Sequence, residues 1–418
     1  MNYVEKIFSV GNLFKNSGNK KKGKKLAIFS VSTIPLVMTL GNSMLIPVLP
    51  SMEKEMGITA FQSSLIITVY SLVAIVLIPI AGYLSDRIGR KKVIIPSLIL
   101  TGIGGLIAGL ASWLMEDGYW LILISRALQG IGAAGSFPIV LPLVGDMFHD
   151  EDQISGALGE IETANTMGKV LSPVLGSFLA GILWFLPFLT IPLFCLVSIA
   201  LMILFVKIPK RQNEALPFKL FLKKVMLIFT ENGRWLYAIF IVGIVLMFVL
   251  FGVLFYLSDI LETKYGIINV QKGLYLALPL GALCLASYLT GKLIKKNKVL
   301  MKWISFTGCI LLGLSIVLLG FSKDLWFLIL IFLVGAIGIG ASLPPLDSLI
   351  TAGIEKEERG TISSIYSSMR FIGVAGGPPM VALMMENFEK LMFYLLTGLC
   401  VVAALATVLF IKPDQNNN

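Results

Sequence analysis

Apolar runs of about 20 residues recur along the whole chain, and this recurrence constrains its fold more than any other feature. A helix of that length crosses the roughly 30 Å of hydrocarbon in a bilayer. Of the 418 residues, 56% are hydrophobic and 14% are charged, and the mean hydropathy of +0.88 exceeds that of water-soluble domains. We count twelve runs and predict an all-α membrane protein with twelve transmembrane helices.

Basic residues predict which ends of these runs face the cytoplasm, because loops rich in lysine and arginine stay on that side. With the amino terminus inside, 26 of the 34 lysines and arginines flank cytoplasmic segments and 5 flank external ones. The other three, Arg126, Lys169 and Arg370, fall inside predicted spans. We therefore predict a multi-pass protein of a cell membrane with both termini cytoplasmic.

The longest polar stretch between spans divides them six and six. Residues 217–229 within it place apolar positions at helical spacing among lysines, which predicts an amphipathic helix on the inner membrane face. The predicted domains are a cytoplasmic basic tail (1–25), a first six-helix bundle (26–207), a cytoplasmic linker (208–234), a second bundle (235–411) and a cytoplasmic tail (412–418).

The two halves also resemble each other. Gly82-Tyr-Leu after the second span has a counterpart in Gly291-Lys-Leu after the eighth, and Ser172-Pro173 has one in Gly377-Pro378. Internal repeats of this kind are typical of transporters that rock two bundles about a central site.

Composition excludes several other classes of protein. The net charge of +10 lies in loops, where it sets topology and attracts anionic lipid heads, so we expect membrane lipids and no nucleic acid as partners. The four cysteines lack paired spacing and the single histidine, His149, has no companion ligands, so no metal or cofactor is expected. The cytoplasmic segments carry no nucleophile constellation or phosphate-binding loop, which argues against an enzyme and against ATP coupling.

The most specific motif is the loop Gly82-Tyr-Leu-Ser-Asp86-Arg-Ile-Gly89-Arg90-Lys-Lys. It resembles the signature loop between the second and third spans of the major facilitator superfamily. The resemblance implies that Asp86 and Arg90 lock two bundles at an inner gate, with Asp146 at the end of span 4 as a third member. It also implies the fold of that family, two pseudo-symmetric six-helix bundles around a central cavity.

Three further motifs match the same family. In span 4, Arg126-Ala-Leu-Gln129-Gly-Ile-Gly resembles the arginine motif associated with proton transfer. In span 5, a motif that contains Gly168, Ser172, Pro173 and Gly176 resembles the glycine–proline pattern of drug and proton antiporters. Serine occupies two positions where that pattern usually has glycine. These four residues are expected to kink the helix. In span 11, residues 360–379, with Gly377 and Pro378, are similar to bacterial multidrug-resistance transporters.

Charged and amide side chains inside spans are costly, so each is a candidate for function. Glu162, Asn165 and Lys169 share one face of span 5, and Glu162 could take up a proton on one side and release it on the other. The proton-coupling candidates are Arg126, Glu162, Lys169 and Asp347. The candidates for the substrate cavity are Asn42, Arg126, Gln129, Asn165, Lys169 and Arg370.

Three cations with few acids predict a net positive cavity for neutral or anionic amphipathic cargo, such as a phenolic compound, a siderophore or an acidic drug. Aromatic residues in the spans, such as Tyr70, Phe137, Phe251, Tyr256 and Tyr366, could line a cavity for cargo. Such residues are more often lipid-facing or packing residues, so we assign them no specific role.

The sequence thus predicts a monomeric, proton-coupled exporter of drugs or metabolites in a bacterial cell membrane, an antiporter that could confer multidrug efflux and antibiotic resistance. Two alternatives stay open. One is a proton symporter for nutrient uptake, and the other is a transporter-like receptor without net transport.

Overall fold

The computed structural model describes residues 3–148, 151–206, 218–294, 297–321, 324–354 and 359–411. His149, the tail 412–418 and linker residues 208–217 lie outside these ranges. The first bundle contains α1 (Tyr3–Ser43), the 3₁₀ turn η1 (Ile46–Val48), α2 (Leu49–Met56), α3 (Ala60–Ile88), α4 (Arg90–Leu114), α5 (Tyr119–Ala134), α6 (Phe137–Met147), α7 (Glu151–Ile182) and α8 (Leu186–Phe205).

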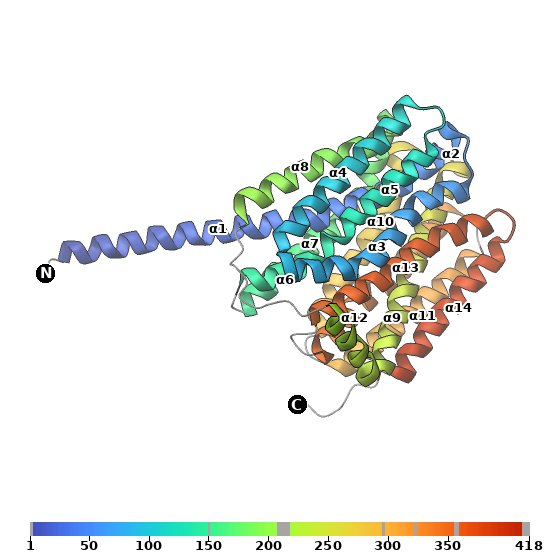
Figure 1. Ribbon diagram of the computed structural model, residues 1–418. Coiled ribbons are helices and arrows are strands. Elements are labelled where there is room, and N and C mark those ends of the chain that lie inside the picture. Colours follow the sequence, from blue (N-terminus) through green and yellow to red (C-terminus); the bar gives the residue numbers. More distant parts are fainter. Residues whose placement is uncertain are drawn as a thin grey trace.

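The second bundle contains α9 (Phe218–Thr263), α10 (Asn269–Ile294), α11 (Lys298–Leu319), α12 (Leu325–Gly353), α13 (Arg359–Met384) and α14 (Glu389–Phe410). Figure 1 shows the two bundles side by side. Within the described residues, ten helical segments are long and apolar enough to cross a membrane. The other two long helices, α7 and α13, are more polar, and both lie against the opposite bundle. The predicted architecture of two six-helix bundles is confirmed.

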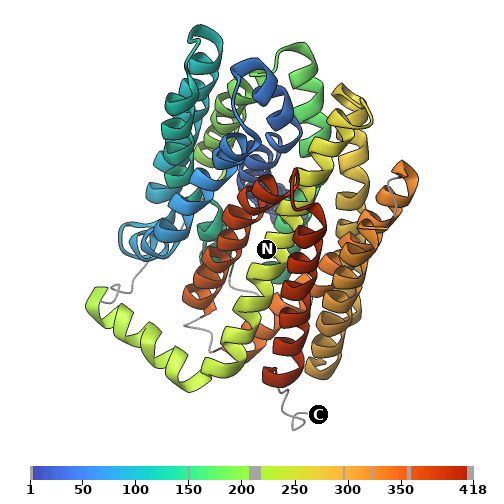
Figure 2. The same ribbon diagram turned by 90° about the vertical axis from the view of Figure 1, so that its right-hand side faces the viewer.

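Three predicted boundaries differ from the structure. Span 4 consists of two helices, because α5 ends before Gly135 and a new helix, α6, begins at Phe137. Pro138 lies in the first turn of α6, where a backbone N–H has no partner within the helix, so the N–H that proline lacks costs no hydrogen bond. Pro47 and Pro50 similarly lie at the starts of η1 and α2, so the span predicted to run from 27 to 50 ends as a helix at Ser43 and is followed by two short helices. The predicted helix at 217–229 is the start of α9, which runs across the end of the bundles before bending into the second one (Figure 2).

Helix pairs repeat between the two bundles. In the first, α7 packs on α1, and a Cβ at Gly176 would overlap the backbone carbonyl of Met44. In the second, α13 packs on α9, and a Cβ at Gly377 would overlap the carbonyl of Phe248. The glycines of the predicted kink motifs therefore allow the backbones to approach closely, while both helices continue through Pro173 and Pro378.

The closest packing between the bundles is that of α3 with α13 and of α7 with α10. Between α3 and α13, Thr68 Oγ1 donates to the Ala375 carbonyl at 2.8 Å and Ser368 Oγ donates to the Ile75 carbonyl at 2.5 Å. Between α7 and α10, the Cβ that Gly273 lacks would lie 2.5 Å from the Pro173 carbonyl oxygen. These contacts are short and uncharged, which suits helices that slide or tilt past each other.

Candidate functional site

A cavity of about 360 Å³ lies between the two bundles. The two ends of the bundles are named as follows. The terminal end is the end at which α14 stops and α9 bends into the second bundle. The distal end is the opposite one. The lining reaches Ile350 and Ser363, which lie within about two turns of the terminal ends of α12 and α13. Toward the distal end the lining stops at Pro173, Leu254 and Leu276, about two turns or more short of the ends of α7, α9 and α10. The cavity therefore opens toward the terminal end.

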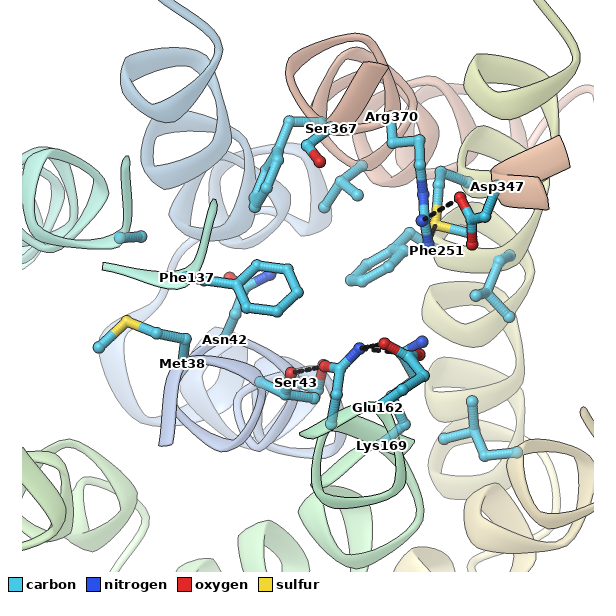
Figure 3. A pocket seen from close by; sticks show the side chains of 18 of the residues that line it. Met38, Asn42, Ser43, Phe137, Glu162, Lys169, Phe251, Asp347, Ser367 and Arg370 are labelled. Carbon is cyan, nitrogen blue, oxygen red and sulfur yellow. Dashed lines mark hydrogen bonds and ion pairs between the residues drawn. The ribbon is translucent and has the colours of Figure 1, made fainter. Parts of the chain in front are cut away.

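One wall of the cavity carries an acid, an amide and a base from α7. Glu162, Asn165 and Lys169 line it, as the shared helix face predicts (Figure 3). Asn165 Nδ2 donates to both Glu162 oxygens, at 3.2 and 3.3 Å, and its Oδ1 accepts from Thr39 Oγ1 at 2.6 Å. These bonds hold the carboxylate toward the cavity, while Lys169 forms no ion pair among the described residues.

The opposite wall carries a second acid and base from the second bundle. An Nη1 atom of Arg370 on α13 lies 3.9 Å from an Asp347 oxygen on α12 (Figure 3). This ion pair is long, and its side chains are 24% and 53% exposed, so both groups have room to change partners. The Arg370 guanidinium also lies 5.7 Å from the centre of the Tyr366 ring.

The formal charges of the lining balance. Glu162 and Asp347 oppose Lys169 and Arg370, so the expected net positive cavity is wrong for the fully ionised protein. The prediction failed because it counted Arg126, which does not line the cavity. The net charge of the four lining groups Glu162, Asp347, Lys169 and Arg370 becomes +1 when either acid takes up a proton.

Arg126 and Gln129 lie outside the cavity lining, although both were predicted to belong to it. Arg126 is 0% exposed and donates to the Ile66 carbonyl at 2.8 Å and to Asn42 Oδ1 at 2.6 Å. It also donates to Gln129 Oε1, and its guanidinium lies 4.5 Å from the centre of the Tyr70 ring. Asn42 and Tyr70 do line the cavity, so Arg126 supports the wall from behind.

Five aromatic side chains line the cavity, namely those of Tyr70, Phe137, Phe251, Tyr366 and Phe371. The first four are among the span aromatics to which the sequence assigned no specific role, and the fifth was not singled out. Sequence periodicity could not identify them because the spans are apolar on every side.

The predicted inner-gate residues form a cluster at the terminal end. Arg90 pairs with Asp86 at 2.6 Å and with Asp146 at 3.0 Å, and it also donates to Ser85 Oγ. The ion pairs that the structure describes here join α3, α4 and α6, and these three helices belong to the first bundle. Gly89 has a φ of +105°, a conformation that favours glycine, and Gly82 faces Ser364 of the second bundle. Locking of one bundle to the other by this cluster stays a prediction.

A second charged cluster, at the distal end, was missed. Lys272 was counted among lysines flanking external segments, but it lies in α10, is 2% exposed and pairs with Glu262 of α9 at 2.8 Å. Glu262 also pairs with Lys54 of α2 at 2.7 Å. No signal in the sequence indicated this burial, because a lysine at the end of a span ordinarily reaches the membrane interface without a partner.

Comparison with known proteins places this architecture in a family. The sequence profile of the Major Facilitator Superfamily matches residues 31–378, and the chain belongs to that family of membrane transport proteins; it is not an enzyme. It is 55% identical to the bacillibactin exporter of Bacillus subtilis over 396 residues, which cover 94% of this chain and 98% of that protein. It is 25% identical to multidrug resistance protein 2 of Bacillus subtilis over 406 residues, covering 94% and 97%.

The same fold occurs in the crystal structure of a D-xylose–proton symporter, with a TM-score of 0.73 and 14% identity, covering 94% of this chain and 99% of that one. At this identity the likeness concerns the fold alone.

Proposed function

We propose that this chain is a proton-coupled exporter of small amphipathic compounds in a bacterial cell membrane, working by alternating access with both termini in the cytoplasm. The observation that carries the proposal is the cavity between the bundles, with one acid and one base on each side. With cytoplasmic termini, its opening at the terminal end is an inward-open state, the state in which an exporter loads its cargo.

Coupling follows from competition at the two carboxylates. A cargo hydroxyl donates a stronger hydrogen bond to the ionised carboxylate of Glu162 or Asp347 than to the neutral carboxyl, which keeps only part of the acceptor capacity. Cargo and proton therefore weaken each other's binding at these groups, which is the requirement for exchange. A proton that enters from outside then favours the cargo-free carrier, and this protonated carrier returns to the inward-open state.

The cargo is inferred from the lining. Aromatic rings offer stacking surfaces, Lys169 and Arg370 attract π systems and anionic oxygens, and the carboxylates accept hydroxyl protons. Phenolic compounds, siderophores and acidic drugs fit this combination. Because its 55%-identical relative is named a bacillibactin exporter, bacillibactin is the first cargo to test.

The test is transport by the purified protein in proteoliposomes with an imposed pH gradient. We expect bacillibactin to move against the proton flow, and Glu162→Gln and Asp347→Asn to lower coupled exchange about tenfold or more, because a neutral amide cannot take up the proton. Glu160→Gln is the matched control, since Glu160 lies on the same helix outside the cavity lining.

Three results would contradict the proposal. Cargo movement in the same direction as protons would replace it with symport. Movement without any proton signal would remove the coupling, and binding without movement would favour a receptor.

A further inference from the structure

The distal end of the cavity is closed by polar contacts between the bundles. Lys272 Nζ on α10 donates to the carbonyl of Pro47 in η1 at 2.7 Å, and Ser258 Oγ on α9 donates to the neighbouring carbonyl of Ile46 at 3.0 Å. Both carbonyls belong to the first bundle and both donors to the second. Lys272 and Ser258 are 2% and 1% exposed, so these bonds are sheltered from water.

The charge of Lys272 is balanced within its own bundle. Its second bond goes to Glu262 Oε2 at 2.8 Å, and Glu262 on α9 is only 8% exposed. The other oxygen of Glu262 accepts from Lys54 of the first bundle at 2.7 Å, but the Lys54 side chain is 63% exposed. The buried ion pair therefore stays within the second bundle, and the links between bundles end on carbonyls or on a solvated lysine.

This division suits a contact that opens and closes repeatedly. When the bundles separate at this end, Glu262 and Lys272 move together, so no buried charge is left alone. The bonds to Pro47, Ile46 and Lys54 break, and water replaces the lost partners of the two lysines.

We infer that Lys272, held by Glu262, latches the distal mouth shut through the Pro47 carbonyl and thereby sets how often the carrier opens to that side. Lys272 is a positioning residue, because it lies outside the cavity lining and acts through the bundle contact. The inference rests on the alternating access of the proposed function, and not on the nature of the cargo or the coupling ion.

The test measures access to the cavity from each side. Ser43 and Ser363 both line the cavity, near its distal and terminal limits, so a cysteine at either position reports on access. The four native cysteines of the full chain are changed to serine, and either Ser43→Cys or Ser363→Cys is then introduced. Each variant is studied in sealed membrane vesicles of known orientation. A membrane-impermeant maleimide is added on one side only, and the labelling rate is followed.

With Lys272→Met, labelling of Ser43→Cys from the distal side should rise about tenfold or more, because a charge-assisted hydrogen bond is lost. Lys54→Met should raise it about threefold or less, because its pair is solvated. Lys390→Met, an exposed lysine at the same end, should leave the rate unchanged.

Labelling of Ser363→Cys from the terminal side separates a shift of state from unfolding. A carrier that opens distally more often should protect this position, so its labelling should slow while that of Ser43→Cys accelerates. Faster labelling at both positions, or no change at Ser43→Cys, would overturn the latch. Neither readout needs transport, so the latch can fail while the export proposal stands, and the reverse.

Discussion

At the scale of single residues, Arg126 and Arg370 are both span arginines with different environments. Arg126 is fully buried and bonded to the Ile66 carbonyl, Asn42 and Gln129, and it holds the cavity wall in place. Arg370 is partly exposed in the cavity, with a long ion pair to Asp347. We therefore propose that the first arginine supports structure and that the second contacts cargo.

Lysine substitutions should separate the two roles. Arg126→Lys removes the fork that reaches Ile66, Asn42 and Gln129 together, so we expect a loss of about 2 to 3 kcal/mol and a clearly lower unfolding temperature in detergent. Arg370→Lys should leave the unfolding temperature nearly unchanged and should weaken cargo binding. Thermal unfolding and binding are measured on the same preparations. Equal unfolding temperatures for the two variants would contradict this assignment.

At the scale of helices, glycines determine how closely neighbouring spans approach. The Cβ that Gly373 lacks would lie 2.6 Å from the Phe248 nitrogen and 2.9 Å from the Met247 Cβ, so α13 and α9 touch through their backbones there. Gly281 of α10 has nothing within 4 Å of the same position. The two glycines look alike in sequence, but only the first is needed for packing.

Alanine at these positions should have opposite effects. Gly373→Ala should destabilise the protein by about 1 to 3 kcal/mol, because the backbone of α9 cannot yield as a side chain would. Gly281→Ala should be neutral or stabilising by up to about 1 kcal/mol, because alanine favours helix. The check is the unfolding temperature of both variants. A stable Gly373→Ala protein would show that α9 and α13 are more loosely packed than the structure indicates.

At the scale of the whole molecule, the function depends on which end of the cavity faces the cytoplasm. The opening lies at the terminal end and the closing contacts lie at the distal end. The distribution of lysine and arginine predicts that the terminal end is cytoplasmic. The cavity then collects cargo from inside the cell.

Reporter fusions test this orientation directly. A fluorescent protein that folds only in the cytoplasm should be bright when fused after Asn418. A phosphatase that is active only outside the cytoplasm should be inactive there and active when inserted at Asp117, in the loop between α4 and α5. The reversed pattern would make the cavity open to the outside and would turn export into uptake.

Much of the fold was predictable because span length and hydropathy are local properties imposed by the bilayer. The twelve spans and the two bundles follow from the apolar runs and the repeated motifs. The shared face of Glu162, Asn165 and Lys169 was also predictable, since helical spacing places them together, whereas Asp86 and Arg90 lie on different helices and were indicated only by the resemblance to the family.

The sequence by itself determined the class of protein, the twelve apolar spans and the presence of Arg126, Lys169 and Arg370 within them, because these depend only on residues close together in the chain. The rotation of each helix against its neighbours decided the rest. It turned Arg126 away from the cavity and Arg370 into it, and it brought Lys272 to the Pro47 carbonyl, 225 positions away along the chain. Such contacts depend on the packing of distant segments, so only the tertiary structure could decide them.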